Sequence, residues 1–139
     1  MALQLTTRND RGPALLLIHG FPLDHRLWDA VVSKLPSTMK IFLPDLPGMG
    51  GSPPDPKVRT IDDYARALLS LMDDRKVARF FVAGHSMGGY IALALYRLAP
   101  ERLAGIALVS SRALPDTEDG RKAREANAER AEKEGSPRP

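Results

Sequence analysis

Short apolar runs alternate with helix-like stretches along this chain, and this alternation limits its possible folds more than any other feature. Four runs are strand candidates, and the first of them is a continuous apolar run, as strands buried on both faces of a parallel sheet are. They cover residues 14–20, 39–45, 79–84 and 102–111. Helices are expected between them over 25–35, over 60–74 and from 87 to Pro100. The order predicts an α/β fold, in which a mostly parallel sheet lies between two layers of helices.

Local signals support two of these helices and suggest which side chains form the core. Thr60 precedes the second helix with Asp63 at the capping-box position, and Pro36 should stop the first. The predicted buried stripe of the second helix consists of Ile61, Tyr64, Ala65, Leu68, Leu69 and Met72. Trp28 and Phe42 are expected in the core, whereas Met49 fits either the core or a loop.

Composition excludes several classes of protein. The chain has 139 residues, enough for one modest domain, and contains no cysteine for disulfides or thiolate metal sites. It contains neither a run long enough to cross a membrane nor a secretory signal, so we expect a cytoplasmic protein without a membrane partner. A net charge of +3 without a basic, aromatic-rich cluster argues against nucleic acid as a partner. The glycine-rich segments match no nucleotide-binding pattern.

The segment "GHSMGG" carries the strongest functional signal. Gly84, Ser86 and Gly88 fit the pattern G-x-S-x-G, between an expected strand and an expected helix. A sharp turn there would expose the serine hydroxyl as a nucleophile, and small residues two positions away would relieve the crowding. The N–H of Met87 at the start of the helix is the first expected oxyanion donor. The second is the N–H of Phe21, in the "HGFP" loop that follows the strand over 14–20.

The three histidines and one aspartate near these motifs receive structural interpretations. His19, His25 and His85 are expected to form hydrogen bonds with loops or to pack. For His19, contact with the predicted cleft is kept as an alternative. Asp45 ends the second predicted strand and is expected to satisfy local backbone groups.

Three segments together resemble a known superfamily. "LLLIHGFPLDHRLW", "PDLPGMGGS" and "GHSMGGYIALA" are similar to the corresponding segments of the α/β-hydrolase fold, in particular to esterases and relatives of 3-oxoadipate enol-lactonase. The resemblance extends to about Arg112. It implies a serine hydrolase that cleaves small carboxylic esters or lactones through an acyl-enzyme, with no metal or organic cofactor. It also implies a catalytic acid and a histidine beyond Ser86, yet no histidine follows His85.

The chain is therefore expected to divide into two parts. Residues 1–111 would form the N-terminal part of the hydrolase core, with the C-terminal part absent, and residues 112–139 either the start of a helical cap or a charged tail. In the tail, Asp116 or Thr117 would cap a helix that Gly135 ends, and for Asp116 this capping role is preferred to a catalytic one. Asp116 is also a candidate for the catalytic acid. Without its histidine the isolated chain should be nearly inactive.

An alternative follows from the run over 103–110. It is apolar on both faces, yet it would form the edge of the sheet. Either a further C-terminal segment or a second copy of the chain would cover it. In the second case the protein would be a non-catalytic interaction module that pairs through this edge as a homodimer.

Overall fold

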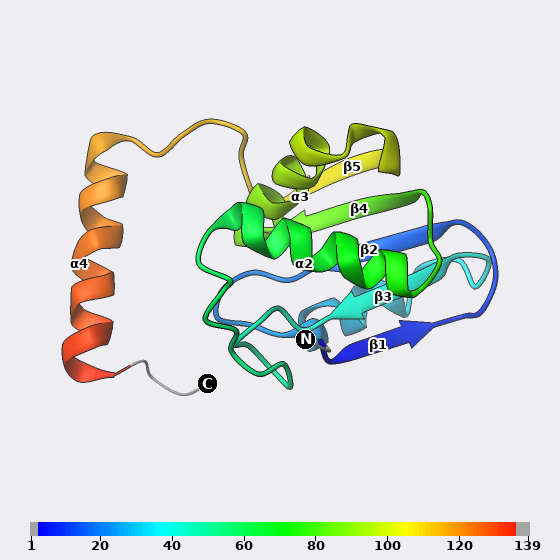
Figure 1. Cartoon of the computed structure of the whole chain (residues 1–139), viewed down its shortest axis with the longest axis horizontal. Helices are drawn as coiled ribbons and strands as arrows, with labels where there is room; N and C mark the ends of the chain where they lie inside the picture. Colours follow the sequence, from blue (N-terminus) through cyan, green and yellow to red (C-terminus); the bar gives the residue numbers. More distant parts are fainter. Residues whose placement is uncertain (1–2, 136–139) are drawn as a thin grey trace.

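The fold is built on a single five-stranded sheet, seen in a computed structural model that describes residues 3–135 (Figure 1). The strands lie in the order β1-β3-β2-β4-β5. Their bounds are β1 Leu5–Arg8, β2 Ala14–Ile18, β3 Lys40–Pro44, β4 Phe80–His85 and β5 Leu103–Val109. The helices are η1 His25–Trp28, α1 Asp29–Val32, α2 Ile61–Asp74, α3 Met87–Leu98, η2 Pro100–Arg102 and α4 Glu118–Glu134. The predicted α/β class and mostly parallel sheet are confirmed.

Strand β1 is the element that the sequence did not reveal. It pairs antiparallel with β3, with Leu5 opposite Pro44 and Arg8 opposite Ile41. Its four residues are at most half-buried and two of them are threonines. An edge strand of this kind needs no continuous apolar run, and so it leaves no signal of the sort that marks β2 to β5.

The helix predicted over 25–35 is wrong in extent. A 3-10 turn, η1, is followed by only four residues of α1, which ends before Pro36. The Asp24 side chain accepts a hydrogen bond from the Arg26 N–H and caps the 3-10 turn. By contrast, α2 begins as predicted, with a complete capping box between Thr60 and Asp63.

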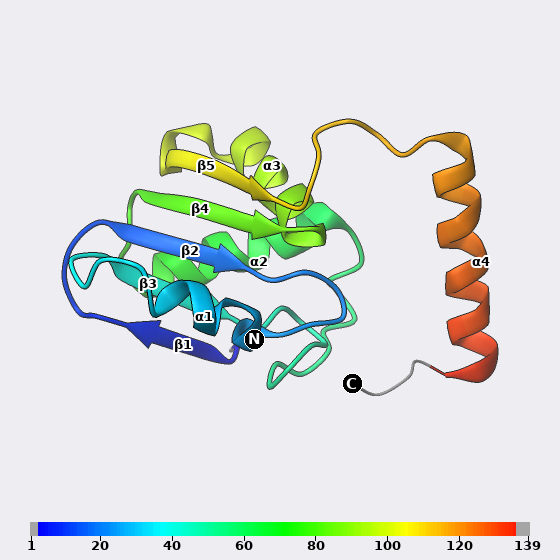
Figure 2. The same cartoon turned by 180° about the vertical axis from the view of Figure 1, so that it is seen from behind.

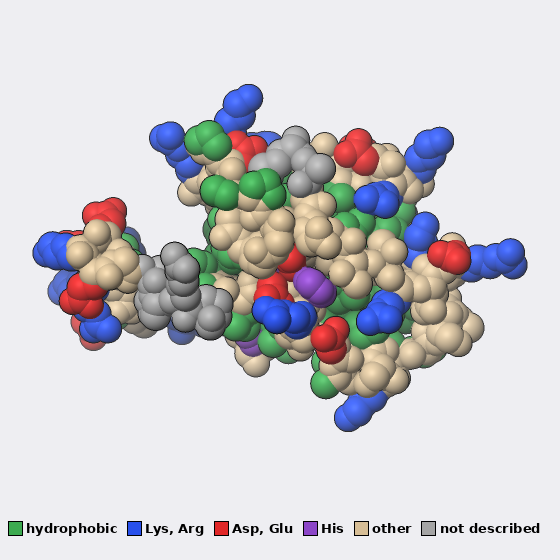
Figure 3. Space-filling model, turned by 90° about the horizontal axis from the view of Figure 1, so that it is seen from below, with side chains coloured by type: hydrophobic (Ala, Val, Ile, Leu, Met, Phe, Trp, Pro, Cys, Tyr) green, Lys and Arg blue, Asp and Glu red, His purple; other side chains and the backbone are tan. Residues whose placement is uncertain are grey.

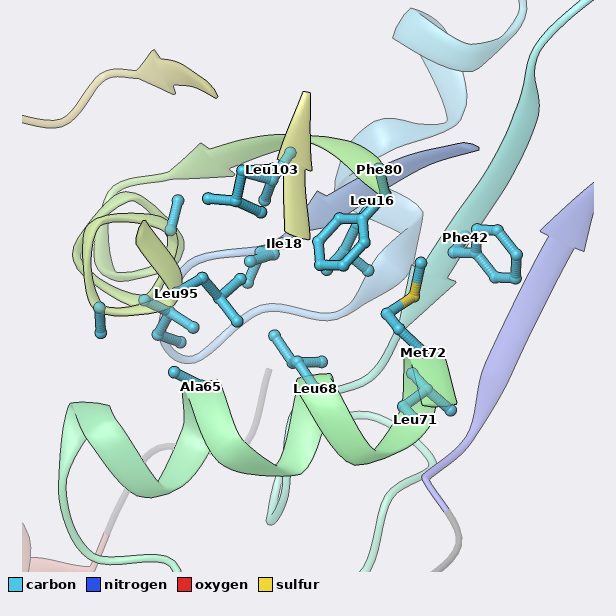
Figure 4. Packing of buried hydrophobic residues seen from close by; sticks show 14 of the residues in the cluster. Leu16, Ile18, Phe42, Ala65, Leu68, Leu71, Met72, Phe80, Leu95 and Leu103 are labelled. Carbon is cyan, nitrogen blue, oxygen red and sulfur yellow. The ribbon is translucent and has the colours of Figure 1, made fainter. Parts of the chain in front are cut away.

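The main core lies between the sheet and the pair α2 and α3 (Figure 4). Leu16 and Ile18 of β2 point to this face, because alternate residues of a strand face the same side. They meet Leu68 of α2 and Leu95 of α3, all fully buried. Phe42 is also in this core, as predicted, and Met49 lies buried against it from the loop after β3.

The opposite face of the sheet is only partly covered (Figure 2). A smaller cluster there consists of Leu17, Trp28, Ile41, Leu43 and Ala83. Beyond it, Phe81 and Val109 remain 39% and 37% exposed. They help to line an open apolar hollow of about 450 Å³ that Trp28 also borders. Strand β5 is thus an edge strand with exposed apolar side chains, as the sequence predicts.

Helix α4 stands beyond the ends toward which β2, β4 and β5 point (Figures 1 and 2). Its surface carries charges of both signs (Figure 3), and none of its residues is buried. Its cap is Thr117, one of the two expected residues, whose hydroxyl accepts from the Gly120 N–H, so the capping role expected for Asp116 is wrong. Gly135 ends the helix at φ 78°, as expected, and residues 136–139 of the predicted tail lie outside the described residues.

Among residues 3–135, no helix combines the length and the apolar character that crossing a bilayer requires.

Candidate active site

Ser86 occupies a sharp turn between β4 and α3. Its backbone has φ 50° and ψ −113°, a left-handed conformation that is rare for a residue with a side chain. The Ser86 N–H donates to the Val109 carbonyl at 3.0 Å, and its carbonyl accepts from the Gly89 N–H at 2.9 Å. Strain of this kind persists only where neighbouring structure holds it, and it clusters at functional sites.

The two flanking glycines are required by close backbone contacts. A Cβ atom on Gly84 would lie 2.1 Å from the Gly88 carbonyl oxygen. A Cβ on Gly88 would lie 2.3 Å from the carbonyl oxygen of Ile18, at the end of β2. Both distances are far below van der Waals contact. The predicted reason for small residues on either side of Ser86 is therefore found in the geometry.

The loop after β2 packs against this turn. A Cβ on Gly20 would lie 3.2 Å from the Ser86 Cβ and 2.8 Å from the Nδ1 of His85. Phe21 comes next in the chain and is 63% exposed. The structure thus brings the beginning of the "HGFP" loop against the serine turn, while the Phe21 side chain remains at the surface.

The start of α3 leaves its first N–H groups available. No side chain caps this end, and the first turn contains no acidic residue. Free N–H groups at a helix N-terminus carry partial positive charge and favour an anion. Met87 begins the helix, so its N–H belongs to this positive end.

His19 is a buried link between two loops. Its Nε2 accepts from the Leu46 N–H at 2.9 Å, and its Nδ1 lies 2.9 Å from the Gly20 carbonyl oxygen. Because a backbone N–H can only donate, Nε2 carries no proton and Nδ1 donates to Gly20. Burial is the main cause that lowers the pKa of His19, so the ring stays neutral. This histidine holds the loop that carries Phe21, as the structural interpretation expects.

Asp45 and His25 form a pair that sequence reasoning missed. Asp45 is buried at the end of β3 and accepts from the His25 N–H at 2.9 Å, the His25 Nδ1 at 2.7 Å and the Gly51 N–H at 2.7 Å. Burial alone would raise the pKa of Asp45, but these hydrogen bonds outweigh it and lower the pKa. The expected backbone contacts are present, and the contact with the His25 ring is additional. Its only sequence signal is an aspartate that directly follows a buried strand.

The remaining candidate groups are engaged elsewhere or have no hydrogen bond. The His85 Nδ1 is buried without a hydrogen-bond partner among the described residues. The carboxylate of Asp116 binds the guanidinium groups of Arg124 and Arg112, and these bonds lower its pKa.

Asp24, His25 and Asp45 hold potential metal ligands within 4.8 Å of one another. Their atoms already bind protein groups, however, because the Asp24 carboxylate accepts from Arg26 and Asp45 from His25 and Gly51. The cluster is therefore explained as an internal polar network.

Comparison with known proteins agrees with this geometry. The family model described as the alpha/beta hydrolase fold matches residues 13–133. An esterase from Thermogutta terrifontis, solved with malate bound, has a TM-score of 0.87 and 36% identity over 96% of this chain and 49% of its own. The enol-lactonase from Burkholderia xenovorans has a TM-score of 0.83 and 27% identity over 96% of this chain and 51% of its own.

A curated relative adds a third comparison. The pimeloyl-[acyl-carrier protein] methyl ester esterase of Nitrosomonas europaea is 36% identical over 106 residues, which are 76% of this chain and 39% of that protein. The chain thus spans about half the length of the solved relatives and less of this curated one. The family match covers most of the chain and includes the serine turn, and the chain belongs to the alpha/beta hydrolase fold family.

Proposed function

We propose that this chain supplies the nucleophile of a serine hydrolase that cleaves small carboxylic esters or lactones. The observation that carries the proposal is the strained backbone of Ser86, at φ 50° between two glycines that no larger residue could replace. The names of the relatives support the substrate class, since they include a methyl ester esterase and an enol-lactonase.

In the proposed reaction the Ser86 Oγ attacks the carbonyl carbon of the substrate. The carbonyl oxygen becomes an oxyanion, held by the N–H groups of Phe21 and Met87. Collapse of this intermediate expels the alcohol, which takes up a proton, and leaves an acyl group on Ser86. Water then attacks the acyl group, releases the carboxylic acid and restores the hydroxyl. The cycle requires neither metal nor organic cofactor.

A base must accept the proton of Ser86, and we propose that it is a histidine outside these 139 residues. His19 is buried with both ring nitrogens engaged, and among residues 3–135 no hydrogen bond joins the Ser86 hydroxyl to His25, whose Nδ1 binds Asp45. The His85 Nδ1 is buried without a hydrogen-bond partner among the described residues, so it does not accept from the Ser86 hydroxyl. The isolated chain should therefore be nearly inactive, with at most the residual rate that oxyanion donors alone provide.

The test adds a C-terminal half taken from a relative. A chimera would continue this chain with the C-terminal half of the Thermogutta terrifontis esterase, which the present chain does not cover, and would be assayed on p-nitrophenyl butyrate. Ser86→Ala should lower kcat by about 10³-fold or more. Ser70→Ala, at an exposed position of α2, is the matched control and should have no effect. Full activity of the Ser86→Ala chimera, or robust Ser86-dependent turnover by the isolated chain, would contradict the proposal.

One observation favours a second candidate function. The apolar side chains on β5 and the hollow beside them resemble a surface that another chain covers. In this alternative the protein is a non-catalytic module that forms a homodimer through β5. Size-exclusion chromatography with light scattering would then show a stable dimer that Ile106→Lys disrupts. A monomer at all concentrations would contradict this alternative.

A further inference from the structure

The end of β5 is tied to the serine turn by two hydrogen bonds. The Val109 carbonyl accepts from the Ser86 N–H at 3.0 Å, and the Ser111 hydroxyl donates to the Ser86 carbonyl oxygen at 2.8 Å. Between them lies Ser110, whose φ of 47° is left-handed although it is not a glycine. The strained backbone of Ser110 thus turns the chain so that the Ser111 hydroxyl reaches the carbonyl oxygen of Ser86, which is itself strained.

Helix α3 has a gap in which the Ser111 side chain lies. A Cβ on Gly89 would lie 2.2 Å from the Ser111 Oγ and 2.5 Å from its Cβ. Any side chain at position 89 would displace the hydroxyl. The Ser111 hydroxyl can therefore occupy its position only because residue 89 is a glycine.

The bonded carbonyl has a direct geometric link to the oxyanion donor. The Ser86 carbonyl and the Met87 N–H belong to the same peptide unit, which is planar and has its C=O and N–H pointing in opposite directions when trans. The ψ of −113° at Ser86 sets the rotation of this unit. Donors from Ser111 and Gly89 fix the oxygen on the protein side. The Met87 N–H must then point the other way.

We propose that Ser111 is a positioning residue, whose hydroxyl orients the Ser86–Met87 peptide so that the Met87 N–H faces the developing oxyanion. The inference rests on the proposed function for its catalytic meaning, but the orientation itself is a property of the resting protein. The bond to Ser111 also polarises the peptide and strengthens its N–H as a donor.

NMR of the labelled full chain tests the orientation without any catalysis. In Ser111→Ala the carbonyl carbon of Ser86 and the amide nitrogen of Met87 should shift together, because they share the peptide that loses a hydrogen bond. Ser33→Ala is the matched control: it removes another hydroxyl that donates to a backbone carbonyl, that of Ala30 at 2.9 Å. It should leave both nuclei unchanged.

Gly89→Ala disturbs the same hydrogen bond in a different way: the new methyl group displaces the Ser111 hydroxyl without removing it. It should shift the same two nuclei in the same direction, and it provides the test if Ser111→Ala does not fold. Unchanged positions of both nuclei in the folded variants would overturn the proposal.

Kinetics of the chimera supply the catalytic readout. Loss of the Ser111 hydroxyl should lower kcat by about 2- to 10-fold, the equivalent of one ordinary hydrogen bond. KM should stay unchanged, because the donor acts mainly on the transition state. An unchanged kcat would overturn the positioning role. Full activity of the Ser86→Ala chimera would instead overturn the proposed function, and the NMR result would still report whether Ser111 orients the peptide.

Discussion

The two faces of the sheet differ in how completely they are covered. On the side of α2 and α3, Leu68, Ile91 and Leu95 are fully buried. On the side of α1, the cover is a single 3-10 turn and four helical residues, and Phe81 and Val109 remain more than a third exposed. The difference teaches that the fold is stabilised mainly from one side. Ser86 lies between the two regions. Its turn leads into α3 on the covered face, and its N–H donates to Val109 of the edge strand β5.

Truncation of one apolar side chain on each side should give the largest contrast. Ile91→Ala removes a fully buried side chain from α3 and should lower the free energy of unfolding by about 2–5 kcal/mol. Val109→Ala, at a position 37% exposed on the α1 side of β5, should cost less than about 1 kcal/mol. Urea unfolding followed by circular dichroism measures both. Equal losses would mean that the open face is covered in solution.

A second comparison adds one methyl group to a glycine of β4, Gly84, and to a glycine of β5, Gly105. Gly84→Ala forces a Cβ to within 2.1 Å of backbone and should cost about 3 kcal/mol or more. At Gly105 the nearest atoms, at 3.0 and 3.2 Å, belong to the ring of Phe81, which is 39% exposed and can move. Gly105→Ala should therefore be nearly neutral in the same unfolding assay. A neutral Gly84→Ala would contradict the tight contact beside Ser86.

The buried network at the loops should make the protein sensitive to acid. The pKa of His19 is lowered from its ordinary 6.5, so its contribution to stability is complete above pH 6.5 and is lost as the pH falls below that value. The slope cannot exceed about 1.4 kcal/mol per pH unit for one proton. Other charged groups near the His19 ring have smaller effects: Asp45 and Asp24 raise its pKa, and His25 lowers it. The lowered pKa of Asp45 adds a loss only at lower pH.

His19→Gln separates this contribution from the others. The variant should be less stable at pH 7.5 but should lack the decline between pH 6.5 and 5.5, measured by urea unfolding at each pH. An identical decline in the variant would assign the acid sensitivity to another group.

The smallest effect is expected at α4. Arg124 binds Asp116 and the hydroxyl of Tyr90, but the helix buries none of its residues. Exposed ion pairs contribute little to stability. Arg124→Ala should therefore leave the urea midpoint unchanged, while limited trypsin digestion should cleave the segment 112–118 faster. A large drop in the midpoint would show that α4 belongs to the folded core.

The parts of the molecule that sequence reasoning predicted are those with local signals. Strands β2 to β5 lie in mostly apolar runs, and α2 has its capping box, so both appear in the sequence. The serine turn is also local, because its glycines lie within two residues of Ser86.

The parts that were missed depend on contacts across the fold. Strand β1 exists because β3 offers it an edge, and the pair of Asp45 and His25 spans 20 residues. The bond from Ser111 to Ser86 spans 25 residues and requires a left-handed Ser110. Asp116 was misassigned because Thr117 also had cap chemistry and Arg112 and Arg124 compete for the carboxylate. Composition and periodicity carry no information on such pairings.

The central claim is that the hydroxyl of Ser86 forms the acyl-enzyme, and trapping that species tests it most directly. The chimera would be mixed with p-nitrophenyl butyrate, quenched in acid within its first turnover and examined by intact-mass and peptide mass spectrometry. We predict one added butyryl group on the peptide that contains Ser86, absent in Ser86→Ala and present in Ser70→Ala. A butyryl group on another residue, or an equal yield in Ser86→Ala, would contradict the account.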